Sequence, residues 1–210
     1  GIQEYNGKKY YFSPETYKNV NGLQSDGKYL YYFDENEGML INTEIVNGEM
    51  IYEIDDQGHA TLSNNNQSIS SAIVREALKY LGTPYKHNSV DGGISCSGLI
   101  SAVFAETGID LKGNAAELAH TIQNDSRYQI IDNPEELQVG DLLFYTKTTC
   151  DEEDDGGEEC NHIGEIHHVA MYIGDGKVIH ATVSESYQCV VVQDMYPLNM
   201  SMVSLIGRVI

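Results

Sequence analysis

Three short segments at the start of the chain repeat at nearly constant spacing, and this repeat most constrains how the first third can fold. They begin at Asn6 (NGKKYYF), Asp26 (DGKYLYYFDENEG) and Asn47 (NGEMIYEIDDQG), a period of about 20–21 residues. Each combines an Asn-Gly or Asp-Gly turn, an aromatic strand and a second turn, which is typical of a β-hairpin. A hairpin of this size cannot bury its aromatic face alone. We therefore expect the hairpins to stack into an array over 1–63. Because the pattern starts mid-unit at Gly1, further units are expected upstream.

A polar stretch, SNNNQS, follows the repeats, and we expect a linker over 64–69. Beyond it the apolar residues change to helical spacing. SSAIVREALKYLG (70–82) predicts one helix, and a second is predicted over 97–107. A third begins where Asn114 and Glu117 have the spacing of a capping box.

From Asp141 onward the apolar pattern changes to that of strands. Five segments show it: DLLFYT, HHVAMYIG, KVIHATV, CVVVQD and SLIGRVI. Helices followed by such strands indicate an α+β domain with an antiparallel sheet. We therefore expect two parts, the repeat array over 1–63 and an α+β domain over 70–210.

The net charge limits the partners of this chain. It is −20, from 32 acidic and 12 basic residues. Such a chain is repelled by nucleic acid and by anionic lipid, so neither is expected as a partner. Since no apolar run reaches the roughly 18 residues that span a bilayer, no membrane insertion is expected either.

Cys96 lies between Ser95 and Ser97, directly before the second predicted helix. Free N–H groups and the helix dipole at that position favour a thiolate, and the same N–H groups can hold an oxyanion. The small neighbours of Cys96 leave room for a substrate backbone. On spacing alone, however, a buried structural cysteine is the simpler interpretation, because a nucleophile requires a base within reach.

Two neighbouring strands supply histidines that can act as this base. His167 and His168 begin HHVAMYIG, and His180 lies in KVIHATV. The GDG turn between the strands decides which of them share a face. A two-residue turn, pairing Gly174 with Lys177, puts His180 on the face of His167, whereas a three-residue loop with a glycine bulge puts it beside His168. The pattern leaves both turns open.

Several motifs in combination resemble the NlpC family of papain-like cell-wall cysteine peptidases. They are ALKYLGTPYKHNSVDGGISCSGLISAVF, NAAELA, LQVGDLLFY, HHVAMYIGDGKVIHA and IGRVI, and they follow the family's order over 70–210. The resemblance implies a papain-like fold, in which the helix that bears the cysteine packs on the antiparallel sheet that bears the histidines.

The resemblance also implies roles for individual residues. Cys96 matches the family's nucleophile, His168 its general base and His180 the residue that orients the base, which favours the three-residue loop. Tyr85 of GTPY is expected to line the cleft with Ser95 and Ser97. The implied reaction is hydrolysis of peptidoglycan stem peptides between D-γ-glutamyl and a diamino acid, with no cofactor and no metal.

The repeats are similar to the choline-binding type of cell-wall-binding repeat. This similarity implies a secreted, wall-associated protein of a Gram-positive bacterium that binds a wall polymer such as teichoic acid or choline. Aromatic cages between such hairpins hold a quaternary ammonium by cation–π attraction, although tryptophan, usual in these cages, is absent from this chain. The alternative is that the aromatic residues stack only to hold the hairpins together.

The sequence departs from the family pattern in three places. Ser95 stands where the family usually has Asp, an acid associated with recognition of the substrate amine. KHNS replaces a WGG-like stretch after GTPY, and the connection over 146–166 is longer than usual. That connection contains an acidic loop between Cys150 and Cys160, for which we expect a disulfide, with a calcium site as the alternative.

Two other functions compete with the endopeptidase. One is a related amidase that uses the same Cys-His pair. The other is a non-catalytic wall-binding protein with a degenerate peptidase domain. Ser95, in place of the usual Asp, favours this alternative, whereas the presence of Cys96, His168 and His180 disfavours it.

Overall fold

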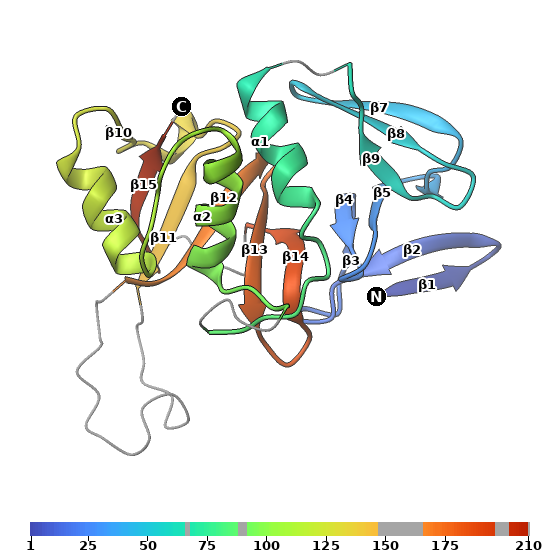
Figure 1. The fold of residues 1–210 in the computed structure, drawn as a ribbon. Helices are drawn as coiled ribbons and strands as arrows, with labels where there is room; N and C mark the ends of the chain where they lie inside the picture. The colour runs from blue at the N-terminus through green and yellow to red at the C-terminus, as the bar shows by residue number, and fades with distance from the viewer. Residues whose placement is uncertain (66–67, 88–91, 147–165, 196–201, 210) are drawn as a thin grey trace.

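A computed structural model describes residues 1–65, 68–87, 92–146, 166–195 and 202–209, and it shows three small sheets beside a larger helix-and-sheet part (Figure 1). Within 1–62, all of which is described, nine strands form the small sheets. They are β1 (Ile2–Tyr5), β2 (Lys8–Phe12), β3 (Asn19–Val20), β4 (Gly22–Ser25), β5 (Leu30–Asp34), β6 (Gly38–Met39), β7 (Thr43–Asn47), β8 (Met50–Ile54) and β9 (Ala60–Leu62).

Each repeat is a three-stranded antiparallel sheet, so the prediction of simple hairpins was incomplete. In the first repeat Asn6 and Gly7 both have positive φ, 51° and 75°, and they form a two-residue turn that pairs Tyr5 with Lys8. The aromatic strand is central in each sheet, because the chain returns after its second turn and pairs with the free edge of that strand.

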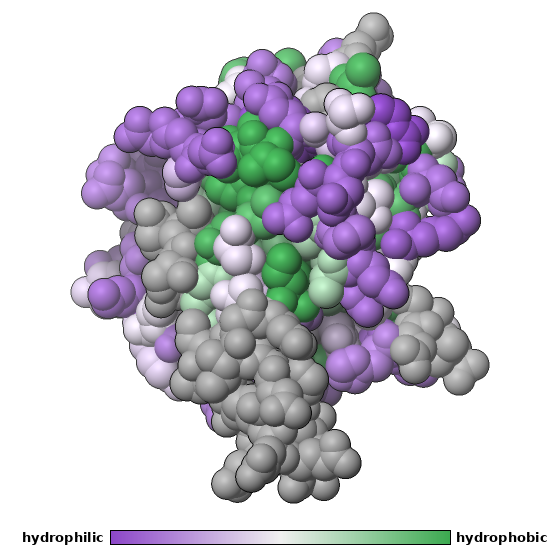
Figure 2. Space-filling model, turned by 90° about the vertical axis from the view of Figure 1, so that its left-hand side faces the viewer, coloured by the Kyte–Doolittle hydropathy of each residue, from purple (hydrophilic) through white to green (hydrophobic). Residues whose placement is uncertain are grey.

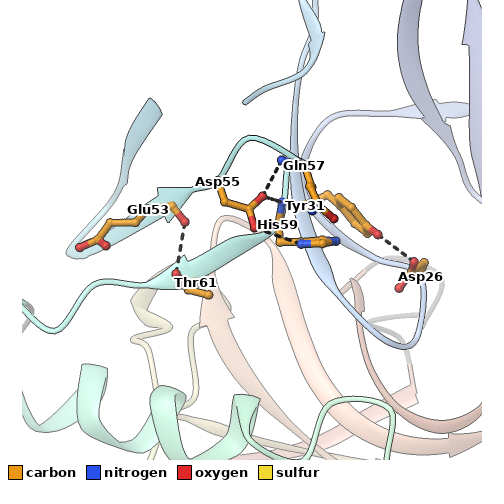
Figure 3. A network of polar contacts seen from close by, with 7 residues as sticks. All are labelled: Asp26, Tyr31, Glu53, Asp55, Gln57, His59 and Thr61. Carbon is orange, nitrogen blue, oxygen red and sulfur yellow. Dashed lines mark hydrogen bonds and ion pairs between the residues drawn. The ribbon is translucent and has the colours of Figure 1, made fainter. Parts of the chain in front are cut away.

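A polar and aromatic network joins the second repeat to the third (Figure 3). The Tyr31 hydroxyl donates to Asp26, and Asp55 accepts from the backbone N–H of His59 at 2.8 Å and contacts its ring at 3.1 Å. The His59 ring stacks on Tyr29 with the centroids 4.0 Å apart. The stacked rings therefore hold neighbouring repeats together.

The described part of the remaining chain contains three α-helices and the strands of one six-stranded sheet. The helices are α1 (Ile69–Leu78), α2 (Cys96–Glu106) and α3 (Ala115–Asn124), and a 3₁₀ turn covers Pro134–Glu136. The strands are β10 (Gln129–Ile130), β11 (Leu142–Thr146), β12 (Ile166–Gly174), β13 (Lys177–Val183), β14 (Gln188–Asp194) and β15 (Val203–Arg208), in the sheet order β10-β15-β11-β12-β13-β14.

The three helix predictions are confirmed to within a few residues. The capping box at α3 forms as expected, with Asn114 and Glu117 each bonding the other's backbone N–H. Helices α2 and α3 pack on β12, and α1 packs on α2, so they cover one face of the sheet (Figure 1). The apolar core runs without interruption from Met50 and Tyr52 of the third repeat, through Ile73 and Leu99 of the helices, to Met171 of β12.

The repeats dock against β14, the edge strand of the six-stranded sheet (Figure 1). The hydroxyl oxygens of Tyr11 and Tyr187 lie 2.5 Å apart. The Lys177 side chain is buried, pairs with Asp194 and donates to the backbone oxygen of Asn21 at 3.2 Å. The first two repeats thus contact the same strands that carry the candidate site.

Figure 2 shows the face of the molecule that lies on the side of α3. Hydrophilic residues cover most of what is described there and surround a smaller hydrophobic area, in keeping with the acidic composition. None of the helices formed by the described residues is long and apolar enough to cross a membrane.

Candidate active site

Cys96 is the first residue of α2, one residue earlier than the predicted start. Ser95 is the N-cap, and its side-chain oxygen accepts a hydrogen bond from the backbone N–H of Gly98 at 3.1 Å. Serine and aspartate are about equally good N-caps, so Ser95 fulfils the local structural need of the helix without adding a charge beside the thiol.

The Cys96 thiol is held close to the sheet. The residue as a whole is 6% exposed, and the backbone N–H groups of Val169, Ser97 and Cys96 itself interact with the thiol. Val169 directly follows His168 in β12. Burial raises the pKa of the Cys96 thiol, while these three N–H groups act in the opposite direction. The N–H groups at the helix start thus act toward the thiolate as expected, but burial outweighs them, and the net effect is a raised pKa of the thiol.

The turn between β12 and β13 is not the predicted three-residue loop. Gly174 pairs with Lys177, and the two turn residues, Asp175 and Gly176, both have positive φ, as a two-residue hairpin turn requires. The next pair is Tyr172 with Val178, so Ile173 is an extra residue of β12 with no opposite residue on β13, which is a β-bulge. The bulge thus lies inside the strand instead of in the turn.

This bulge nevertheless places His180 beside His168, because it shifts the register of β12 by one residue. The ring atoms His168 Nε2 and His180 Nδ1 are 2.8 Å apart, and the rings meet edge to face. His167, the alternative partner, is exposed. A two-residue turn without the bulge would have put His180 on the face of His167.

Both histidines of the pair are neutral at pH 7. Burial lowers the pKa of His168 well below 6.5, and the nearby His180 and His167 lower it further. Burial also lowers the pKa of His180 to about 4, although its contact with Gln193 acts in the opposite direction. A neutral imidazole has one ring nitrogen free to accept a proton, which a general base requires.

Sequence reasoning missed Gln193 and Glu15. Gln193 Oε1 lies 2.7 Å from His180 Nε2, and Gln193 Nε2 donates to Glu15 Oε1 at 3.1 Å. Gln193 is opposite Val178 in the β13–β14 ladder and therefore shares a sheet face with His180. The only sequence signal was the alternation in CVVVQD, which becomes informative only when the register of the two strands is known.

The other predicted residues lie close to the start of α2 in the chain or in the fold. Tyr85 is half-buried, and its backbone forms a bridge with Ile94, two residues before Cys96. Its ring meets that of His87 edge to face at 5.4 Å. Ser97 is 8% exposed and lies in the first turn of α2. The expected Cys150–Cys160 disulfide, the calcium alternative and residues 88–91, which include part of the KHNS stretch, lie outside the described residues.

Replacement of Ser95 separates its capping role from its chemical role. Ser95→Ala should lower the free energy of unfolding by about 1 kcal/mol, because α2 loses its side-chain cap, whereas Ser95→Asp should leave it within about 0.5 kcal/mol of the original. Urea unfolding of the three proteins measures both effects. Equal stability of the wild type and the alanine variant would show that the Ser95–Gly98 bond contributes nothing.

Comparisons with known proteins agree with this architecture. The model of the NlpC/P60 family matches residues 82–204. A γ-D-glutamyl-L-lysine dipeptidyl-peptidase from Bacillus cereus is 32% identical over 114 residues, which cover 54% of this chain and 28% of the relative. The chain thus matches less than a third of that relative's length.

Two solved structures extend the comparison. A structure from Staphylococcus aureus, described as similar to a lipoprotein of the NLP/P60 family, has a TM-score of 0.50 and 28% identity, and the match covers 67% of this chain and 41% of that one. An NlpC/P60 family protein from Bacillus cereus has a TM-score of 0.50 and 22% identity over 93% of this chain and 58% of that one. That second match shows the fold alone, and it extends into the repeats. The family model covers more than half of the chain, and the chain therefore belongs to the NlpC/P60 family.

Proposed function

We propose that this protein is a cysteine endopeptidase that hydrolyses peptidoglycan stem peptides at D-γ-glutamyl–diamino acid bonds. One observation carries the proposal: His168, whose ring contacts His180 of the neighbouring strand β13 at 2.8 Å, directly precedes Val169 of β12, whose backbone N–H contacts the Cys96 thiol. The name of the Bacillus cereus relative, a γ-D-glutamyl-L-lysine dipeptidyl-peptidase, supports the substrate class.

In the proposed mechanism, Cys96 attacks the scissile carbonyl carbon while its thiol proton passes to His168. Since burial favours the neutral forms of both groups, the proton moves during the attack instead of before it. Backbone N–H groups at the start of α2, that of Cys96 among them, hold the oxyanion. His168 then protonates the leaving amine. Water hydrolyses the thioester with His168 again as base, and His180 orients the ring throughout.

The pH dependence of the reaction follows from the lowered pKa of His168. The base must be neutral, so kcat/KM should stay level as the pH falls to 6.5 and decline only below it. Initial rates on a stem peptide between pH 5 and 9 measure this decline of kcat/KM on the acid side. A half-maximal value at pH 7 or above would contradict the proposed burial of the base.

The repeats are proposed to hold the enzyme on the wall outside the cell of a Gram-positive bacterium. Support comes from exposed aromatic side chains, Tyr5 at 70% and Tyr17 at 83%, which are available to a polymer such as teichoic acid or choline. Sedimentation with purified walls, with and without their teichoic acid, tests this role. Equal sedimentation of the wild type and a Tyr5→Ser/Tyr17→Ser variant would exclude these two side chains from the contact.

Digestion of purified muropeptides separates the three candidate functions. The wild type and Cys96→Ala are incubated with the same muropeptides, and the products are identified by mass. Cleavage after D-γ-glutamyl by the wild type alone is expected. Release of the intact stem at the sugar–lactyl amide would indicate an amidase, and wall binding without turnover would indicate a binding protein.

A further inference from the structure

A chain of polar contacts leads from the candidate base to the N-terminal repeats. His168 Nε2 contacts His180 Nδ1 at 2.8 Å, and His180 Nε2 contacts Gln193 Oε1 at 2.7 Å. Gln193 Nε2 then donates to Glu15 Oε1 at 3.1 Å. Gln193 belongs to β14, whereas Glu15 lies between β2 and β3 of the first repeat. The chain of contacts therefore joins two parts of the protein.

The chemistry of each member determines the direction of these bonds. The Glu15 carboxylate only accepts, so the amide nitrogen of Gln193 faces it and the amide oxygen faces His180. His180 Nε2 must then carry the proton, which leaves its Nδ1 as an acceptor. His168 Nε2 in turn donates to that Nδ1, and the remaining lone pair of His168 is on Nδ1. This is the tautomer that can take a proton from a thiol.

The opposite orientation of Gln193 would produce the opposite result. With its NH₂ group toward His180, the proton of His180 would be on Nδ1 and would be donated to His168 Nε2. His168 would then carry its own proton on Nδ1 and could not act as the base. In serine proteases, an error of this kind in the histidine tautomer costs about 10⁴-fold in kcat.

We propose that Glu15 and Gln193 are positioning residues that select the Nε2–H tautomer of His180 and, through it, that of His168. This inference rests on the proposed function, since it assigns the base of that reaction. His180 is 1% exposed, so its Nε2 has little access to solvent and has Gln193 as its hydrogen-bond partner. Glu15 is itself exposed, so its influence is smaller than that of Gln193 and acts only through the orientation of the amide.

Two changes of charge test the proposal in the whole chain. Glu15→Lys replaces an acceptor by a donor and should turn the Gln193 oxygen away from His180. Adding Gln193→Glu should restore the original tautomers, because a carboxylate at 193 accepts both from the lysine and from His180 Nε2. Glu35→Lys makes the same change of charge at an exposed position of the second repeat and is the matched control.

The first measurement is the nitrogen spectrum of ¹⁵N-labelled histidine, which reports which ring nitrogen carries the proton. The signals of His168 and His180 are identified by their loss in His168→Gln and His180→Gln. The wild type and Glu35→Lys should show Nε2–H for both rings. In Glu15→Lys, a measurable fraction of the molecules should carry the proton of both rings on Nδ1 instead. The double variant should return to the wild-type spectrum.

The second measurement is kcat/KM on a stem peptide. Glu15→Lys should lower it in proportion to the fraction of His168 that moves to Nδ1–H, by at least about twofold, and the double variant should recover most of this loss. An unchanged tautomer in Glu15→Lys, or Nδ1–H on His168 in the wild type, would overturn the proposal. If the wild type cleaves no stem peptide, the proposed function fails, and the spectra alone still decide the role of Glu15 and Gln193.

Discussion

Cys96→Ala should lower kcat/KM on a D-γ-glutamyl–diamino acid stem peptide by at least about 10³-fold, because the proposed reaction forms a covalent bond to this sulfur. His168→Gln should produce a loss of similar size, since its amide can hydrogen-bond but cannot take the thiol proton. The two losses should not add in the double variant, because the residues act in the same step. Initial rates measured by product mass test all three.

Cys189 provides the control for this prediction. It is a free cysteine, half-buried in β14, and its thiol lies 4.0 Å from the backbone oxygen of Gly27 in the turn of the second repeat. Cys189→Ala should retain most of the activity. A Cys96→Ala protein that keeps more than a tenth of the wild-type activity would contradict a nucleophilic role for Cys96.

The stability of the fold should fall in mild acid because His180 is buried in its neutral form. Its pKa is about 4 in the folded protein and about 6.5 in an unfolded chain. Below pH 6.5 the unfolded state therefore binds a proton that the folded state does not, and the free energy of unfolding decreases as the pH falls toward 4. The free energy of unfolding falls by about 3 kcal/mol in total as the pH drops below both pKa values. About 2 kcal/mol of this decrease has occurred by pH 5.

Urea unfolding at pH 7 and pH 5 measures this loss. His180→Gln is the matched variant, because it keeps a polar side chain that cannot titrate. Its free energy of unfolding should be lower at pH 7 but should fall by about 2 kcal/mol less than that of the wild type between the two pH values. Equal decreases in the two proteins would show that His180 is not buried in its neutral form.

Local signals predicted the elements that carry the site. Asn114 and Glu117 are three residues apart, the spacing from N-cap to N3 in any helix that starts there, so their capping box could be identified from sequence and is confirmed. The start of α2 was also predictable, because an apolar helical pattern begins directly after Ser95 and Cys96. Both cases depend only on residues that are neighbours in the chain.

The parts that sequence did not predict depend on register and burial. The bulge at Ile173 was missed because the GDG turn satisfies a two-residue turn and a three-residue loop equally well. Gln193 and Glu15 were missed because the sequence does not reveal that the first repeat contacts β14. The raised pKa of Cys96 depends on its burial against β12, which outweighs the helix terminus that the sequence suggests.

The most direct test of the central claim is covalent labelling of the wild-type protein by a substrate analogue. A short stem peptide that ends in a D-γ-glutamyl electrophile is compared with its L-γ-glutamyl and D-α-glutamyl counterparts, and the labelled residue is located among the four cysteines by peptide mass. We expect one equivalent of the D-γ-glutamyl analogue on Cys96 and little labelling by the other two. Labelling of Cys189 instead of Cys96, or equal labelling by all three analogues, would contradict the account.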